Sequence, residues 1–569
     1  MSTPTATAEP GRVPGAADPK RWVALAVVLI AGFMQLVDIS IVNVAIPSIQ
    51  RDLDATYAQI QWVLAGYQLA FAVMLITGGR LGDIFGRKRL FMIGMAGFTL
   101  ASALCGLAQS PEMLIGSRVL QGLFGAVMFP QILSVIQVTF PPQERATAFG
   151  MFGATIGLAT ITGPLVGGLL IEADLFGLQW RPIFLVNVPI GILALAAASR
   201  YLVESRSPRA LRLDPIGVAI VTTGLLLLVY PLVQGRDLDW PLWTFLSMAA
   251  SVPVLALFAV YERHKKRLDG SPLVDLDLFR QRSFAPGLAV AGIFFMGIPA
   301  FFLIFSLWLQ IGLGFTALHA GLTGIPFAVG SALASAASVR LAPALGRRIL
   351  SVGSLLLIAG MAGLVWTVDR YGGAIHSWQL IPALLVCGLG LGSVVAPLVN
   401  VVLAGIRGQD AGSASGVLTT VQQVGGAVGV ALIGVIFFGL LASQAAGVAD
   451  DVIPGMQRNL QAAGLPPAAT QQVAAGFRTC FEDRSNAKDP SAVPASCARA
   501  QAQGQGQPRL AEVVGAAADT ARRDNFSKAF QRTLLFEIGV FLASFLLVFL
   551  LPQARREEVG QHAEAPAAL

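Results

Sequence analysis

Long apolar segments alternate with short polar ones along almost the whole chain. A helix that crosses a bilayer needs about 20 apolar residues, and fourteen segments meet this requirement. They are Trp22–Pro47, Gln59–Gly79, Leu90–Ala108, Met113–Phe140, Ala146–Ile171, Ile183–Leu202, Pro215–Gln234, Trp243–Tyr261, Ala285–Gly312, Gly321–Val339, Ile349–Val368, Leu380–Ala404, Gly412–Leu441 and Thr533–Leu551. The pattern predicts an all-α polytopic membrane protein with 14 transmembrane helices.

Basic residues are distributed unevenly between the two sets of loops that join these spans. One set, taken with the two tails, holds 24 Lys and Arg residues, whereas the opposite short loops hold 4. Cytoplasmic loops of membrane proteins are enriched in Lys and Arg, so the asymmetry predicts that both termini are cytoplasmic. The segment 442–532, rich in Ala, Gln, Gly and Pro, then lies outside, and we expect a loosely ordered loop with some short helix.

The composition excludes several classes of protein. The 569 residues are 55% hydrophobic and only 12% charged, with a mean hydropathy of +0.69, whereas a soluble domain is roughly 25% charged. An ordinary soluble enzyme and a disordered chain are therefore excluded. The net charge of +7 comes from residues scattered through the loops, so no nucleic-acid partner is predicted. Arg outnumbers Lys, and Ala and Gly are abundant, which is typical of GC-rich bacterial coding.

A repeated motif divides the chain into two halves. Arg80–Leu90 and Arg340–Leu350 share Arg, Leu, Gly, Arg and Leu in register, 260 positions apart. Internal duplication of helical halves is typical of transporters. The predicted organisation is a cytoplasmic tail (1–21), an N-terminal six-helix bundle (22–204), two inserted transmembrane helices with a cytoplasmic linker (205–283), a C-terminal six-helix bundle (284–552) that includes the outside loop 442–532, and a cytoplasmic tail (553–569).

Four motifs resemble those of one transporter family. Gly79–Arg89 is similar to the signature loop between the second and third helices of the major facilitator superfamily, and Leu114–Gly122 to its fourth-helix motif. Gly163–Gly168 resembles the antiporter motif of the exporter branches. Leu36–Pro47 resembles the first-helix motif of the fourteen-helix drug:proton antiporters, and the stretch Trp180–Gly191 also resembles that branch. The resemblance implies the major facilitator fold and export by alternating access. Two residues depart from the family pattern: Ser40, where Thr is usual, and Pro182, where a polar residue beside an aromatic one is common.

The resemblance also implies roles for particular residues. The loop is expected to latch the inner ends of the helices and control the switch between states, through Gly79, Asp83, Gly86, Arg87 and Lys88. The antiporter motif contributes Gly163, Pro164, Gly167 and Gly168. Pro164 removes a backbone donor and bends its helix, and the glycines allow backbones to approach closely. Plain helix packing is the alternative role for any one of these glycines.

Charged residues are almost absent from the spans. Arg118 is the only basic residue well inside one, and Asp38 and Glu537 are the buried acids. Asp38 lies about 13 Å and Arg118 about 9 Å from the outer ends of their spans, at 1.5 Å per residue. Intramembrane charges mark proton or substrate pathways, so Asp38 and Arg118 are predicted to couple export to protons; a static ion pair is the alternative. Glu537 is expected to lie nearer the outer surface and to matter less.

A substrate cavity is expected between the halves near the midplane. Its candidate lining residues are aromatic or carry amides, which suits bulky lipophilic compounds. They are Trp62, Gln68, Gln121, Gln131, Phe295, Phe305, Trp308, Asn400, Gln422 and Gln423. Packing in the helix core or contact with lipid is the alternative for each aromatic residue, and a hydrogen bond between helices for each amide.

Several kinds of chemistry are not supported by any motif. No Lys follows a Gly, so there is no phosphate-binding loop for ATP, and the four His residues lack zinc-site spacing. No cofactor, metal or enzymatic activity is predicted. Cys480 and Cys497, in the outside segment, are expected to form a disulfide rather than remain free thiols. Cys105 and Cys387 lie in apolar spans and are expected to be unpaired.

The sequence therefore predicts a proton-coupled efflux antiporter for lipophilic drugs or antibiotic-like compounds in a bacterial plasma membrane. Its predicted partners are the exported compound, protons and lipid, and we expect a monomer. The alternative on the same fold is a transporter of one small metabolite, in either direction. A sensor or channel is a third possibility, which the interior charges disfavour because they are costly without a gating or relay role.

Overall fold

The computed structural model describes residues 20–207, 211–403, 406, 411–488, 493–504 and 508–552. These residues form helices and contain no strand. Each of the fourteen predicted spans overlaps a long helix or two consecutive helices, and thirteen of these are long and apolar enough to cross a membrane. The other is α5 (Pro142–Glu172), with 31 residues. The all-α membrane fold is confirmed; the two predicted tails lie outside the described residues, apart from Lys20 and Arg21.

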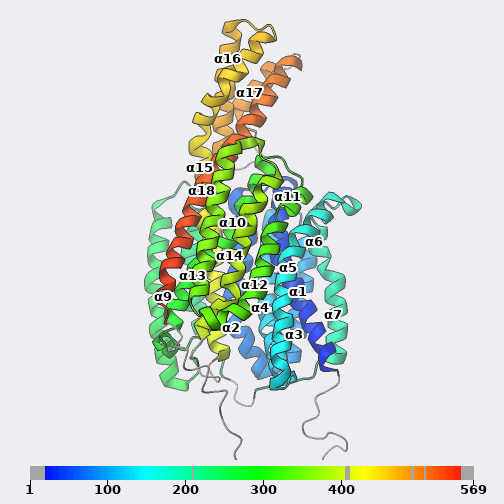
Figure 1. Ribbon diagram of the computed structural model, residues 1–569, viewed down its shortest axis with the longest axis vertical. Helices are drawn as coiled ribbons and strands as arrows, with labels where there is room; N and C mark the ends of the chain where they lie inside the picture. The colour runs from blue at the N-terminus through cyan, green and yellow to red at the C-terminus, as the bar shows by residue number, and fades with distance from the viewer. Residues whose placement is uncertain are drawn as a thin grey trace, which may run out of the picture.

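The N-terminal bundle contains the first six spans. They are α1 (Arg21–Asp52), α2 (Tyr57–Phe85), α3 (Arg87–Gly106), α4 (Pro111–Thr139), α5, and the consecutive helices α6 (Pro182–Leu185) and α7 (Asn187–Tyr201). The main contacts join α2 and α3 to α4, α1 to α5, and α7 to α3 and α1. Figure 1 shows these helices running side by side along the long axis of the molecule.

The C-terminal bundle repeats this arrangement. Its helices are α10 (Phe284–Leu307) with the π-helical turn Trp308–Gly312, α11 (Ala317–Thr323), α12 (Ile325–Leu345), α13 (Arg348–Tyr371), α14 (Ser377–Leu403), α15 (Ala411–Ala462) and α18 (Pro508–Val548). Here α12 and α13 pack on α14, α10 on α15, and α18 on α13 and α10. Each pair corresponds to a pair in the first bundle, as a duplicated six-helix unit requires.

Two further helices stand between the bundles in the sequence. α8 (Pro215–Gln234) packs on α2 and α15, whereas α9 (Leu242–Asp269) packs mainly on α8 and lies at the edge of the molecule (Figure 1). The outward face of α9 carries exposed Leu246, Val252 and Val260. Exposed apolar side chains on a helix at the edge of a membrane protein are suited to contact with lipid.

The segment 442–532 differs from the expected loose loop, because its described residues are mostly helical. α15 has 52 residues, a length of about 78 Å, so it continues well beyond a bilayer. Together with α16 (Pro467–Asn486), α17 (Ala495–Gly504) and the start of α18, it forms a projection above the bundle (Figure 1). The projection is well ordered because it has a hydrophobic core of its own. The core consists of Val448, Ala449, Met456, Leu460, Ala474, Phe477, Leu510, Ala517 and Ala521.

A disulfide joins Cys480 on α16 to Cys497 on α17, while Cys105 and Cys387 are free and buried. We expect a thiol reagent applied to intact cells to leave all four unmodified, and to label Cys480 and Cys497 only after reduction. The disulfide joins residues 17 positions apart and should contribute about 3 kcal/mol to the stability of the projection. Cys480→Ala/Cys497→Ala is the control; labelling of either cysteine without reductant would contradict the pairing.

Candidate functional site

Asp38 of α1 and Arg118 of α4 form an ion pair inside the N-terminal bundle. Arg118 Nη1 lies 2.6 Å from Asp38 Oδ2, and the side chains are 1% and 0% exposed. α4 begins where the Ser110 hydroxyl accepts a hydrogen bond from Met113 N at 3.2 Å, which places Arg118 about two turns into the helix. The two charges that the sequence places inside the spans are thus in direct contact.

Asp38 accepts two more hydrogen bonds. Gln121 Nε2 and Asn187 Nδ2 donate to Asp38 Oδ1 at 2.8 and 3.0 Å. All three partners of the carboxylate are donors. The Arg118 guanidinium also donates to Gln121 Oε1 at 2.7 Å and lies 4.3 Å from the centre of the Tyr67 ring. The network therefore occupies three of the roughly four acceptor positions of the Asp38 carboxylate.

Two members of this network were not predicted as site residues. Asn187 connects Asp38 to Ser102 of α3, because Asn187 Nδ2 lies 3.0 Å from Ser102 Oγ. Tyr67 covers the guanidinium of Arg118 and accepts a hydrogen bond from Gln35 at 3.3 Å. Asn187 falls within the stretch Trp180–Gly191, and the resemblance of that stretch to the antiporters was the available signal. Tyr67 had no distinguishing signal in the sequence.

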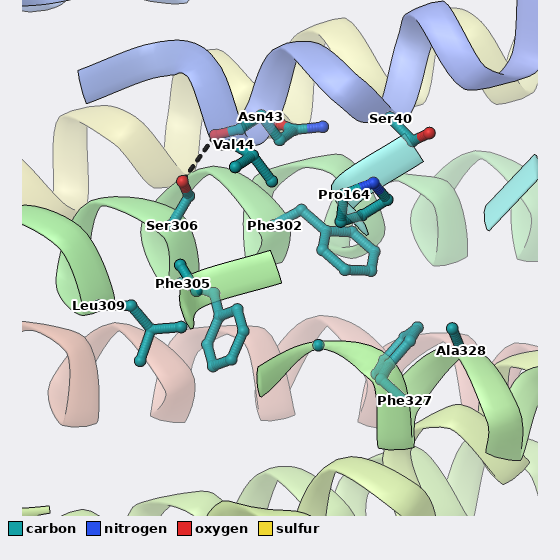
Figure 2. Close-up of a pocket in the computed structure, with 12 residues that line it drawn as sticks. Ser40, Asn43, Val44, Pro164, Phe302, Phe305, Ser306, Leu309, Phe327 and Ala328 are labelled. Atoms are coloured by element: carbon teal, nitrogen blue, oxygen red, sulfur yellow. Dashed lines mark hydrogen bonds between the residues drawn. The ribbon is translucent and has the colours of Figure 1, made fainter. Parts of the chain in front are cut away.

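A small pocket lies between the two halves, within the set of helices α1, α5, α10, α11 and α12 (Figure 2). Phe302, Phe305 and Phe327 form its aromatic part. The polar side chains at the pocket are Ser40, Asn43 and Ser306. The remaining lining residues are Val44, Pro164, Leu309, Ala320, Gly324 and Ala328. The pocket is therefore largely apolar and lies close to the antiporter motif.

Hydrogen bonds join the halves beside the pocket. The Ser306 hydroxyl donates to the Asn43 carbonyl at 2.6 Å, the dashed line in Figure 2. Gln310 Nε2 donates to the Val44 carbonyl at 2.9 Å. Thr316 Oγ1 donates to Glu172 at 3.0 Å, at the far end of α5. These contacts lie at one end of the helices. The distribution of Lys and Arg in the loops predicts that this end faces the outside.

Of the ten residues predicted to line a substrate cavity, Phe305 lines this pocket. Three others form contacts between helices. Gln121 is part of the Asp38 network, and Gln131, 1% exposed, donates to the Gly78 carbonyl at 2.9 Å. Trp308 stacks on Phe530 of α18, with ring centres 4.3 Å apart.

The remaining predicted cavity residues are dispersed. Trp62 packs on Tyr230 of the inserted helix α8 at 5.9 Å, so it faces away from this pocket. Gln68 contacts α15 of the other half, because a Cβ atom at Gly426 would lie 2.9 Å from its Oε1. Four further residues do not line the pocket: Phe295, which packs on Phe294, the exposed Asn400, and the half-buried pair Gln422 and Gln423 on α15.

The antiporter motif on α5 is packed against both halves. A Cβ atom at Gly163 would lie 1.8 Å from Ser40 Oγ, and one at Gly167 would lie 2.7 Å from Ile41, both on α1. A Cβ atom at Gly168 would lie 2.6 Å from Leu318 Cα on α11. Close approach of backbones is possible only where no side chain intervenes. The motif therefore joins α5 to α1 and α11 without space for larger residues.

The loop between α2 and α3 is held by the end of the N-terminal bundle. Gly86 has φ +114°, and a Cβ atom there would lie 2.5 Å from Glu204 Oε1, so only glycine suits the position. The Glu204 carboxylate accepts from Lys88 N and Arg89 N at 3.1 and 3.2 Å, which caps the start of α3. Gly79 packs on Pro130 of α4 at 3.7 Å.

The end of α2 is joined to the chain segments on both sides of the inserted helices. Arg80, 8% exposed, donates to the carbonyls of Arg212, Ser271, Pro272 and Leu273. Arg347, the counterpart of Arg87 in the second half, donates to the carbonyls of Phe549 and Leu551 at the end of α18. In both halves, an arginine of the repeated motif therefore donates hydrogen bonds to backbone carbonyls of a distant chain segment at the same end of the bundle.

Asp83→Asn is expected to slow export while leaving the protein folded. Asp83 Oδ1 lies 2.9 Å from Arg87 Nη2, and the carboxylate is 39% exposed, so the pair contributes only about 0–1 kcal/mol to stability. Efflux rate at equal membrane abundance is the measurement. Asp277→Asn, which removes an exposed partner of Lys266, is the control. Unchanged export by Asp83→Asn would make Asp83 an ordinary turn residue.

Known relatives share this sequence over most of its length. It is 44% identical to a probable actinorhodin transporter of Streptomyces coelicolor over 545 residues, covering 95% of this chain and 93% of that protein. It is 36% identical to the puromycin resistance protein of Streptomyces alboniger, covering 75% and 84%. It is 33% identical to the tetracenomycin C resistance and export protein of Streptomyces glaucescens, covering 80% and 82%.

Solved structures share the fold. A bacterial homologue of the human lysosomal transporter Spinster superposes with a TM-score of 0.58 at 16% identity, covering 94% of this chain and 98% of that one. A POT family transporter superposes with a TM-score of 0.56 at 16% identity, covering 73% and 91%. Residues 28–430 match the sequence pattern of the Major Facilitator Superfamily. With its duplicated bundles and its four motifs, the chain belongs to the Major Facilitator Superfamily.

Proposed function

We propose that this protein exports lipophilic, antibiotic-like compounds across the plasma membrane in exchange for protons. The observation that carries the proposal of antibiotic export is the 44% identity with a probable actinorhodin transporter over 95% of the chain. The puromycin and tetracenomycin C relatives extend the same chemistry to other bulky compounds. The aromatic pocket between the halves suits such compounds, because apolar walls with few polar groups bind lipophilic ligands.

The pocket is one part of the proposed binding site. It encloses about 70 Å³, whereas sites for drug-sized molecules occupy about 300–1,000 Å³. The substrate therefore enters when the two bundles move apart, and Phe302, Phe305 and Phe327 supply the apolar surface against which it packs. Ser40, Asn43 and Ser306 supply the polar contacts that orient it.

Proton coupling is proposed to use the Asp38–Arg118 pair. In the conformation described, three donors hold the Asp38 carboxylate. A helix movement that withdraws Arg118 leaves a carboxylate in an apolar interior, where it takes up a proton because the charged form is costly. Return of Arg118 expels that proton. Because Asp38 lies five residues before the pocket residue Asn43 on α1, movement of α1 connects the two sites.

The membrane arrangement follows from the same proposal. Both termini are cytoplasmic, so the projection built from α15 to α18 lies outside and the loop between α2 and α3 lies inside. Export from a bacterial cell driven by protons requires the plasma membrane, where the proton gradient exists. We propose a monomer surrounded by lipid, since each chain contains both six-helix halves.

The test is efflux from a bacterial host that lacks its own drug pumps. Actinorhodin, puromycin and tetracenomycin C are loaded into cells with and without the protein, and a hydrophilic aminoglycoside serves as control. We expect export of at least one of the three, with complete loss of export after addition of a protonophore. Export that survives collapse of the proton gradient would refute proton coupling, and export of none would refute the substrate class.

A further inference from the structure

Glu537 lies in the core of the C-terminal bundle without any partner. Its side chain is 0% exposed, and neither carboxylate oxygen has a hydrogen-bond partner among the described residues. It belongs to the buried stripe of α18 that also contains Leu534, Phe541 and Ser544. Glu537 therefore points into the bundle, although its position in the sequence suggested a site near the outer surface.

The helices around Glu537 bring no charge to it. α10 contains no titratable residue, and the only one on α14 is Cys387. The titratable residues of α13 lie at its ends, namely Arg348, Asp369, Arg370 and Tyr371, and those of α15 lie in the projection, namely Asp450, Asp451 and Arg458. On α18 the nearest charge is Arg532, which is exposed on another face of the helix. Within the part of the chain that the structure describes, no counter-ion is therefore available to an ionised Glu537.

A buried carboxylate without donors or counter-ion is unstable, and such a group becomes neutral by binding a proton. Asp38 is in the opposite situation, since Arg118, Gln121 and Asn187 all donate hydrogen bonds to its carboxylate. The two buried acids thus have opposite surroundings in the same conformation. This difference comes from their hydrogen-bond partners alone.

The duplication of the fold relates Glu537 to a residue of the Asp38 network. α7 and α18 are the sixth helices of their bundles, and both pack on the first and third. Asn187 and Glu537 stand at the same position within the two predicted spans. Asn187 donates to Asp38, whereas α10, the counterpart of α1, carries no acid. The C-terminal half therefore has its own titratable group at the level where the N-terminal half holds its ion pair.

We propose that Glu537 is a second proton-binding site, occupied in this conformation and emptied when α18 moves relative to α13 and α10 during transport. This inference rests on the proposed proton-coupled export. The step is Glu537–COOH to Glu537–COO⁻, with the proton passing to water. The buried hydroxyls of Ser544 on α18 and Ser354 on α13 also lack partners among the described residues, and they offer hydrogen bonds to water that enters between these helices.

Infrared spectroscopy of the full-length protein in liposomes tests the bound proton. A protonated carboxylic acid has a carbonyl band distinct from that of a carboxylate, and the band shifts in deuterated water. We expect a band at neutral pH that is absent in Glu537→Gln, is retained in Asp38→Asn and in Glu112→Gln, and weakens as pH rises. A band that survives Glu537→Gln, or that never responds to deuterium or pH, would overturn the proposal.

The number of protons exchanged per substrate tests release. The probe is whichever of actinorhodin, puromycin and tetracenomycin C the efflux assay selects. Glu537→Gln imitates the protonated form, so we expect export to continue with about half the protons released per molecule exported, whereas Asp38→Asn abolishes export. An unchanged ratio in Glu537→Gln would overturn the second site. A wild-type protein that releases no protons would instead overturn the proposed function, and the infrared result would still decide whether Glu537 binds a proton.

Discussion

Asp38→Asn is expected to abolish proton-driven export while the protein still inserts into the membrane. The amide has nearly the shape of the carboxylate, so it can keep one hydrogen bond from Arg118 or Gln121, but it cannot bind and release a proton in the physiological range. Without that cycle, substrate binding no longer displaces a proton. The measurement is substrate-evoked proton release in proteoliposomes that contain equal amounts of each protein.

The control separates coupling from stability. Asp38→Asn leaves Arg118, which is 1% exposed, buried without its counter-ion, and removal of one member of a buried pair costs about 3–5 kcal/mol. In the double variant Asp38→Asn/Arg118→Gln the uncompensated charge is absent. We expect it to be more stable than Asp38→Asn and equally inactive. A normal proton signal from Asp38→Asn would remove this residue from the mechanism.

Gly168→Val is expected to block the cycle by preventing the contact between the two halves. A Cβ atom at Gly168 would lie 2.6 Å from Leu318 Cα and 2.8 Å from Ala317 O, and both are backbone atoms that cannot rotate away. Overpacking of this kind costs about 1–3 kcal/mol. A free-energy cost of about 1.4 kcal/mol changes an equilibrium constant tenfold. The conformation in which α5 packs on α11 should therefore become about tenfold or more less populated, and export should fall by a similar factor.

Gly150 provides a matched control on the same helix. A Cβ atom there meets nothing within 4 Å, so Gly150→Val has the same effect on helix propensity without the clash. We expect normal export from Gly150→Val. In Gly168→Val, a cysteine introduced by Ser306→Cys in the pocket should react faster with a membrane-impermeant reagent applied from outside. Equal export by the two variants would show that the contact between α5 and α11 is dispensable.

The interior charges show what local sequence and tertiary packing each contribute. Asp38 and Arg118 could be singled out from the sequence because a charge within an apolar span is rare and costly. Asn187 and Tyr67 could not be assigned to the same site, since neither is unusual in a membrane helix. Only the packing of α7 and α2 around α1 and α4 brings them within reach.

The amide residues show a second limit of the sequence. Gln121 and Gln131 were candidates for a substrate cavity, with hydrogen bonds between helices as the alternative. Both do face inward, but toward neighbouring helices of their own bundle, where Asp38 and the Gly78 carbonyl accept their hydrogen bonds. Inward orientation and exposure to a cavity are separate properties, and only the arrangement of the neighbouring helices distinguishes them.

The sequence by itself determined the fourteen apolar segments, the two related halves, the family motifs and the pair of interior charges. These are local properties, because the cost of placing a charge or a polar backbone in lipid depends on segment length and composition. The direction that each side chain faces was decided by tertiary structure. A spanning helix is apolar on all sides, so its periodicity does not reveal its packed face. For the same reason, the position of Glu537 in the bundle core without a partner and the pocket beside Phe305 emerge only once the helices are packed together.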